Sequence, residues 1–191
     1  MLNLPNFLTL IRILTIPFFL IYLAYHRYGE AFVVFVVGGI TDFLDGLTAR
    51  LMNQQTAIGA YLDPVADKLL VITSFVMLGL IEGVPMWLAV VVVSRDVLLI
   101  LGYGIIYLLV EERLQAKPSW IGKCSTMLQL LTLGTALALL AEPRLFGDFG
   151  DWVMNGLIAL TALATIASGV QYIYRGLVWL QNRAPSITRL G

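Results

Sequence analysis

Four aspartates stand at regular spacings beside two apolar segments, in the pattern Asp42-x-x-Asp45 followed by Asp63-x-x-x-Asp67. They are four of the twelve acidic residues in a chain that is 59% hydrophobic. Carboxylates next to such segments are costly unless a cation lies among them. The natural candidates are Mg²⁺ and Mn²⁺, which prefer oxygen ligands, and two such ions roughly 4 Å apart are a familiar arrangement for phosphate chemistry.

Helical periodicity accounts for the spacing of the aspartates. At about 100° per residue, Asp42 and Asp45 fall on one stripe of a helix. Asp63 and Asp67 are four positions apart and share one face of the next helix. Two neighbouring helices can therefore present four carboxylates to one point, where their mutual repulsion favours a bound divalent cation.

Small residues and one cation accompany the carboxylates. Gly46 and Ala49 continue the first stripe, Arg50 lies at its edge, and Gly59 precedes the second pair. The two glycines allow a ligand to approach the backbone closely, and an arginine can hold a phosphate through two hydrogen bonds. A single aspartate has simpler explanations, such as a helix cap, a helix–helix contact or part of an ion pathway. The full set at fixed offsets predicts metal-assisted transfer at a phosphorus centre.

Six apolar segments must position these residues, because about 20 residues are needed for a helix to cross a bilayer. The segments span 7–25, 30–52, 63–81, 86–110, 121–141 and 152–176. The second and third are short in purely apolar residues, so we expect their aspartate-bearing ends to protrude on the same side. The sequence thus predicts an all-α integral membrane protein with six transmembrane helices, a single domain over 1–191 and no internal repeat.

Basic residues predict the orientation of these spans. Six spans place both termini and the 50–68 and 111–123 connections on one side, which carries eight Lys and Arg residues against two on the other. Cytoplasmic loops are enriched in these residues. We therefore expect a multi-pass protein, in a bacterial cytoplasmic membrane, with the aspartates and both termini on the cytosolic side.

Composition excludes several other classes of function. The formal net charge is zero, so no basic field indicates a nucleic-acid partner. His26 and Cys124 are single, and a zinc site needs about three or four nitrogen and sulfur ligands. We expect Cys124 to be an ordinary buried thiol.

The window 42–67 resembles the signature of the CDP-alcohol phosphatidyltransferase family, D-x2-D-G-x2-A-R-x8-G-x3-D-x3-D, and contains all eight specified residues. The resemblance extends over most of the chain, through the opening 5–12 and the segments 62–68, 94–96 and 117–123. It implies six transmembrane helices around a cytosol-facing polar cavity, usually in a homodimer. It also implies release of CMP from a CDP-linked donor, here CDP-diacylglycerol, by attack of an alcohol.

The resemblance also implies roles for the signature residues. It makes Asp42, Asp45, Asp63 and Asp67 ligands of a two-metal site for Mg²⁺ or Mn²⁺, and Asp67 in addition the general base. The residues that would line the CDP site are Gly46, Ala49, Arg50 and Gly59.

The acceptor alcohol is predicted less directly. Arg95 and Asp96 lie within the fourth span, where an ion pair indicates either a functional site or a helix–helix clamp. We expect a cationic pocket at the start of the fifth span, formed by Lys123 with Arg113 and Lys117 and adjoined by Ser119. The alternative is that these basic residues only set the topology. Such a pocket suits glycerol-3-phosphate, the acceptor of phosphatidylglycerophosphate synthases.

Two differences between this chain and the phosphatidylglycerophosphate synthases favour a different acceptor. Those synthases usually have Arg-Glu in place of Arg95-Asp96 and a second lysine near Ser125. In both respects the chain resembles the CMP-forming cardiolipin synthases, whose acceptor is phosphatidylglycerol. Glycerol-3-phosphate and phosphatidylglycerol therefore both stay open as acceptors. An inositol- or serine-type acceptor is a remote third. Phospholipase-D-like cardiolipin synthases are excluded because their chemistry uses paired histidines. A transporter or channel is the main alternative from another class, but its acids should be distributed along a pathway.

Overall fold

The protein is built from six α-helices, which are the only regular elements in the part of the chain that the structure describes. The computed structural model describes the backbone of residues 4–52, 59–110 and 119–187 and the side chains of 13–41, 68–102, 119–144, 147–178 and 181. The helices are α1 (Leu4–Ala24), α2 (Tyr28–Met52), α3 (Gly59–Leu80), α4 (Met86–Val110), α5 (Trp120–Ala141) and α6 (Pro143–Ile187). Each predicted apolar segment falls on one of them, so the prediction of an all-α fold is confirmed.

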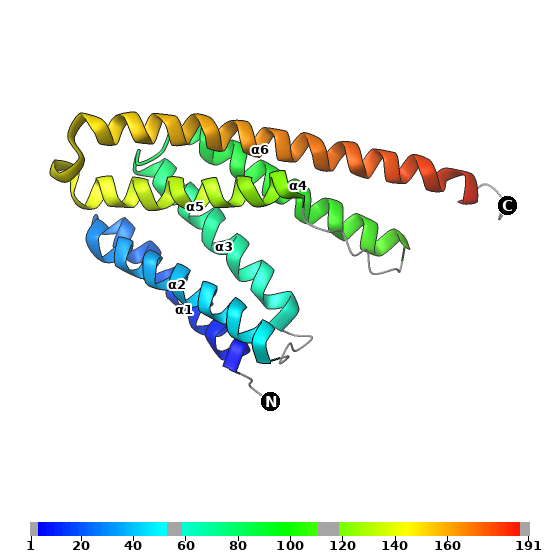
Figure 1. Cartoon of the computed structure of the whole chain (residues 1–191), viewed down its shortest axis with the longest axis horizontal. Helices are drawn as coiled ribbons and strands as arrows, with labels where there is room; N and C mark the ends of the chain where they lie inside the picture. Colours follow the sequence, from blue (N-terminus) through cyan, green and yellow to red (C-terminus); the bar gives the residue numbers. More distant parts are fainter. Residues whose placement is uncertain (1–3, 53–58, 111–118, 188–191) are drawn as a thin grey trace.

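The helices form an up-and-down bundle in which successive helices run in opposite directions (Figure 1). Helix α5 packs against α6 along most of its length, and α3 lies in contact with α1, α4 and α5. The turns between α1 and α2, α3 and α4, and α5 and α6 all lie at one end, called here the hairpin end. The C-terminal end of α2 and the N-terminal end of α3 lie away from it, so both signature segments occupy the opposite end.

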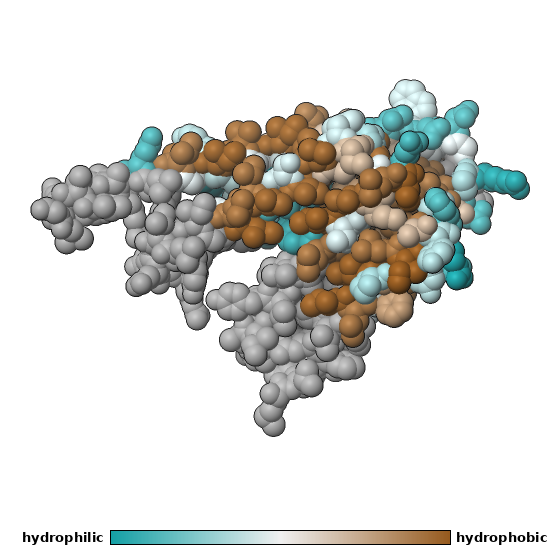
Figure 2. Space-filling view, turned by 180° about the vertical axis from the view of Figure 1, so that it is seen from behind, coloured by the Kyte–Doolittle hydropathy of each residue, from teal (hydrophilic) through white to brown (hydrophobic). Residues whose placement is uncertain are grey.

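Two helical stretches are long and apolar enough to cross a membrane by length and composition, within the residues that could be tested: Trp120–Ala141 and Gly147–Val178. Shorter apolar stretches are Ile13–Ala24, Tyr28–Thr41 and Lys68–Leu80. Figure 2 shows that hydrophobic residues cover most of the described surface on that face, while hydrophilic ones gather mainly at the hairpin end. A surface so rich in exposed apolar side chains indicates association with a membrane.

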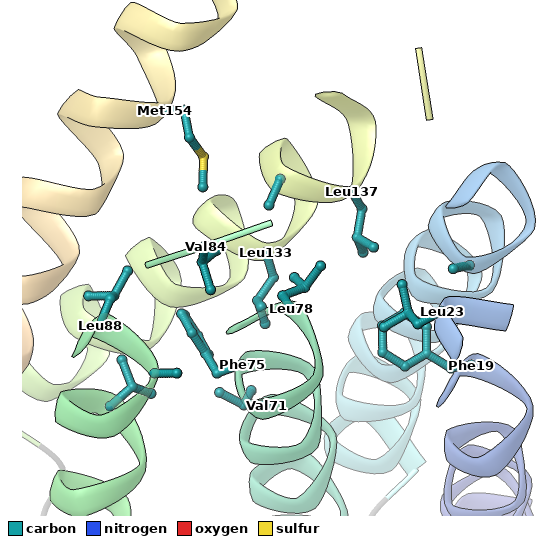
Figure 3. Packing of buried hydrophobic residues seen from close by; sticks show 14 of the residues in the cluster. Phe19, Leu23, Val71, Phe75, Leu78, Val84, Leu88, Leu133, Leu137 and Met154 are labelled. Carbon is teal, nitrogen blue, oxygen red and sulfur yellow. The ribbon is translucent and has the colours of Figure 1, made fainter. Parts of the chain in front are cut away.

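Buried apolar side chains form one core in the half of the bundle nearer the hairpin end (Figure 3). Phe75 and Leu78 of α3 are fully buried between Leu88 of α4 and Leu133 of α5. Phe19 and Leu23 bring α1 against the same cluster. This core fixes α3 against α4 and α5, and therefore sets the position of the residues further along α3 toward the signature.

The helix boundaries differ from the predicted ones mainly in α3 and α6. Helix α3 begins at Gly59 rather than at residue 63, so that Gly59, Asp63 and Asp67 share one helix. Helix α6 begins at Pro143, a residue tolerated in a first turn, and continues to Ile187 instead of ending near residue 176. Within it, Gly147 has a φ of 46°, which breaks the helical path where the sequence predicted a turn.

Candidate active site

The signature residues lie on two helices. Asp42, Asp45, Gly46, Ala49 and Arg50 belong to α2, and Gly59, Asp63 and Asp67 belong to α3. Their side chains lie outside the described residues, so their predicted roles as metal ligands, base and CDP contacts stay predictions. The side chains that are described contain no cluster of three or more His, Cys, Asp or Glu residues.

The residue directly after Asp67 joins the signature to a buried ion network. Lys68 Nζ donates to Oδ1 of Asp96 on α4 at 2.7 Å. Arg95, next to Asp96 on the same helix, donates to the same oxygen through Nη1, also at 2.7 Å. The Asp96 side chain is 0% exposed and that of Arg95 is 6% exposed, whereas Lys68 is 27% exposed. One carboxylate oxygen therefore holds two cations from two helices.

Arg95 extends this network to α6. Its Nη2 donates to the hydroxyl of Ser168 at 2.6 Å, and its guanidinium carbon lies 5.7 Å from the centre of the Tyr172 ring. Buried charges are stable only when they are paired and hydrogen-bonded, and Arg95 satisfies this condition through three neighbours. Among the described residues, Nε of Arg95 and Oδ2 of Asp96 have no hydrogen-bond partner. Both atoms are shielded from solvent.

The first turn of α5 packs against the Arg95 side chain. Ser119 caps the helix, because its Oγ accepts a hydrogen bond from the backbone N–H of Gly122 at 3.0 Å. A Cβ atom at position 122 would lie 3.1 Å from Oη of Tyr172, 3.2 Å from Oγ of Ser119 and 3.5 Å from Nη2 of Arg95. Glycine is therefore the residue that lets α5 approach α6 and the Arg95 side chain this closely.

The predicted acceptor residues separate into two groups. Arg95 and Ser119 come together around Gly122, and Asp96 is joined to them through its ion pair with Arg95. Lys123 is exposed, and its ammonium lies 5.4 Å from the centre of the Trp120 ring rather than in the network. Arg113 and Lys117, the other predicted members of the cationic pocket, lie outside the described residues.

Cys124, expected to be buried, is exposed, so that prediction was wrong. It lies on the same turn of α5 as the exposed Lys123 and directly before the buried Ser125.

Three members of the network were not singled out as site residues from the sequence: Lys68, Ser168 and Tyr172. The signal for Lys68 was its position directly after Asp67, since a cation next to a row of carboxylates has to be paired with something. Ser168 and Tyr172 are four positions apart and so share a face of α6, but nothing in the sequence connects that face with Arg95.

A second polar cluster joins α5 to α6 further toward the hairpin end. Ser125 and Thr165 are hydrogen-bonded at 3.1 Å, and Gln129 donates to Thr165 at 3.2 Å. Thr132 and Thr161 are hydrogen-bonded at 2.7 Å. All five side chains are fully buried, so this polar seam is a contact between helices rather than an accessible site.

Comparison with known proteins agrees with the chemistry predicted from the signature. The sequence model of the CDP-alcohol phosphatidyltransferase family matches residues 2–167. A protein of Mycobacterium tuberculosis named as a probable phosphatidylglycerophosphate synthase is 33% identical over 92% of this chain and 82% of its own length. A CDP-diacylglycerol–glycerol-3-phosphate 3-phosphatidyltransferase of Haemophilus influenzae is 32% identical over 90% of this chain and 91% of its own length.

A third relative carries a different name. A putative cardiolipin synthase of Mycobacterium bovis is 38% identical, over 65% of this chain and 59% of its own length. The family model covers both signature helices and, of the buried ion network, Lys68, Arg95 and Asp96. The chain belongs to the CDP-alcohol phosphatidyltransferase family.

Proposed function

We propose that this protein transfers the phosphatidyl group of CDP-diacylglycerol to glycerol-3-phosphate, releasing CMP and forming phosphatidylglycerophosphate. The observation that carries the proposal is the complete eight-residue signature on α2 and α3 of a chain that belongs to this family. The names of relatives aligned over about nine-tenths of the chain support glycerol-3-phosphate as the acceptor.

The donor set of the signature fits a divalent metal. It consists of carboxylates alone, and oxygen-only sites suit Mg²⁺ and Mn²⁺. Asp42, Asp45, Asp63 and Asp67 would hold two such ions, which when bound polarise the phosphate and neutralise its charge. The predicted CDP contacts, Gly46, Ala49, Arg50 and Gly59, lie on the same two helices.

Asp67 is proposed as the general base. An alcohol is a weak acid, so its oxygen attacks phosphorus efficiently only when a base removes the hydroxyl proton. In the proposed reaction the acceptor oxygen forms a bond to the phosphorus that carries the diacylglycerol. The bond from that phosphorus to the CMP oxygen breaks, and the proton passes to the Asp67 carboxylate. Such a base contributes about 10²–10⁴-fold to the rate.

The acceptor is proposed to lie near the first turn of α5. Lys123 supplies a positive charge there for an anionic acceptor, with Arg113 and Lys117 as further candidates. Ser119 supplies a hydroxyl there. Arg95 Nε and Asp96 Oδ2, which have no hydrogen-bond partner among the described residues, add a donor and an acceptor of the kind that suits a hydroxyl of a glycerol unit. The exposed position of Lys123 favours binding of a charged group rather than a structural role.

The membrane topology is also proposed rather than observed. Six helices in an up-and-down bundle, exposed apolar faces and the asymmetry of basic residues support six spans with the signature end in the cytosol. We also propose a cytosol-facing cavity between the signature helices and α5, and a homodimer, as the family resemblance implies. A transporter is set aside because the chain belongs to a family of phosphatidyltransferases.

Cardiolipin synthesis from phosphatidylglycerol is the second candidate function. Asp96 in place of glutamate and the lack of a second lysine near Ser125 favour it, as does the identity to the putative cardiolipin synthase. The structure adds that Ser125 is fully buried and bonded to Thr165, so this position offers the acceptor no exposed group.

One experiment decides between the two acceptors. The purified protein is supplied with CDP-diacylglycerol and Mg²⁺ or Mn²⁺, and CMP release is followed with glycerol-3-phosphate and with phosphatidylglycerol separately. We expect release with glycerol-3-phosphate, and none after chelation of the metal. Release with phosphatidylglycerol alone would assign the second function, and no release with any alcohol would contradict both.

A further inference from the structure

We propose that Asp96 is a positioning residue that keeps the Lys68 ammonium away from the carboxylates of the signature. The inference rests on the proposed function, in that those carboxylates are taken to bind divalent metal. It adds a role in metal affinity for a residue pair that lies outside the signature itself.

The argument starts from the position of Lys68. It follows Asp67 directly on α3, so its ammonium belongs to the same helical turn as a proposed metal ligand. A lysine side chain is a compact charge on a flexible stem of four carbons, and it pairs with whichever anion is within reach. Asp67 and Asp63 lie one and five positions before it on the same helix, so an unrestrained Lys68 would act as a competing cation at the signature.

Asp96 gives Lys68 a different partner. The Nζ–Oδ1 distance is 2.7 Å, and the carboxylate is fully buried, where the attraction between opposite charges is less screened than at the surface. The pair draws the Lys68 side chain toward α4. The ammonium that could neutralise the signature is therefore already bound to an anion on another helix.

Arg95 holds this anion in place. Its Nη1 binds the same oxygen of Asp96, while Ser168 and Tyr172 of α6 fix the guanidinium from the other side. Asp96 would be neutralised by Arg95 alone, so a helix clamp between α4 and α6 does not need Lys68. The second cation on one buried oxygen is what distinguishes the network from a simple clamp.

The test uses Mn²⁺ binding to the purified full-length protein without substrate, followed by electron paramagnetic resonance of free Mn²⁺. We expect Asp96→Asn to weaken Mn²⁺ binding by about tenfold, because it releases Lys68 toward the signature. Adding Lys68→Met to that variant removes the competing cation and should restore the affinity to within about threefold of wild type. Glu30→Gln, which removes the carboxylate of an exposed ion pair with Arg27 at the hairpin end, is the matched control and should leave binding unchanged.

The double variant separates this role from a structural one. Damage caused by an unpaired Arg95 would be equally present in both Asp96 variants, so absence of recovery in the double variant would overturn the inference. If Asp96→Asn does not fold, Lys68→Met alone still tests it in a protein whose Arg95–Asp96 pair is intact. That variant should bind Mn²⁺ as wild type does, and a clear gain in affinity would show that Lys68 already competes.

Failure of the proposed function would give a different pattern of results. A wild-type protein that binds no Mn²⁺ and releases no CMP would contradict the function and the inference together. A wild-type protein that does both, with an Asp96→Asn variant of unchanged Mn²⁺ affinity, would overturn the inference alone.

Discussion

Replacing Gly122 with alanine should destabilise the protein at the junction of α4, α5 and α6. The added Cβ would meet Tyr172 Oη at 3.1 Å and Ser119 Oγ at 3.2 Å, both closer than ordinary van der Waals contact. Overpacking of this kind costs about 1–3 kcal/mol. Because the tip of Tyr172 and the Ser119 hydroxyl can each yield by a few tenths of an ångström, we expect a cost in the lower half of that range.

Gly134→Ala on the same helix is the matched control. Its Cβ would meet only Phe35, at 3.6 Å, which is ordinary contact. Both substitutions gain the same helix propensity, about 1 kcal/mol, so this gain cancels when the two variants are compared. The expected difference in unfolding free energy is about 1–2 kcal/mol, or roughly 2–8 °C in melting temperature for a chain of this size.

The assay is thermal unfolding of both variants in the same detergent, together with CMP release at saturating metal. We expect Gly122→Ala to melt below Gly134→Ala and to lose activity as Tyr172 is displaced from Arg95. Equal melting temperatures would contradict the close approach of α5 to Tyr172 and Arg95.

Three further outcomes follow from the contacts described. Asp67→Asn should lower CMP release by about 10²–10⁴-fold while CDP-diacylglycerol still binds, and substantial retained turnover would remove Asp67 from the base role. Ser168→Ala should reduce stability by about 1.5–3 kcal/mol, measured by thermal unfolding, because Arg95 Nη2 loses its hydrogen-bond partner; an unchanged melting temperature would contradict this. The pKa of Glu30 is lowered by its backbone hydrogen bond and then by Arg27, so its contribution to stability is present above the ordinary pKa and lost as the pH falls below it. Because this ion pair lies at the surface, the contribution should be too small to shift melting, so the melting temperature of Glu30→Gln should match wild type from neutral to acidic pH, and a measurable drop would show that the pair matters.

The helices were predictable because each is a long apolar segment bounded by glycine, proline or charge. The six predicted ranges match the observed helices closely, with the largest difference at the C-terminal end of α6, where Trp179 and Leu180 continue the apolar pattern. The start of α3 was placed too late because Asp63 was taken as the first residue of an apolar span, whereas helix formation does not require apolar residues.

The signature was also predictable, since its residues occupy fixed positions within two helices. The ion network was not, because its members lie far apart in the sequence: Lys68 is 28 positions from Asp96, and Arg95 is 73 positions from Ser168. Such pairings depend on how the helices rotate against one another, and hydropathy specifies only which face is apolar. Apart from Ser94 and Asp96, the residues of α4 around Arg95 are apolar, so hydropathy does not predict which way its side chain points.

The polar seam between α5 and α6 has a consequence for how the chain assembles. Among the described residues, the stretches long and apolar enough to cross a bilayer lie on these two helices, and in lipid an apolar side chain gains little by moving from acyl chains to a neighbouring helix. Apolar packing alone would therefore allow α5 to pack on α6 in several orientations about its helix axis. Ser125, Gln129 and Thr132 find their partners Thr165 and Thr161 in one orientation only. The register of this helical hairpin is therefore specified by its own hydrogen bonds and does not depend on contacts with α1 to α4.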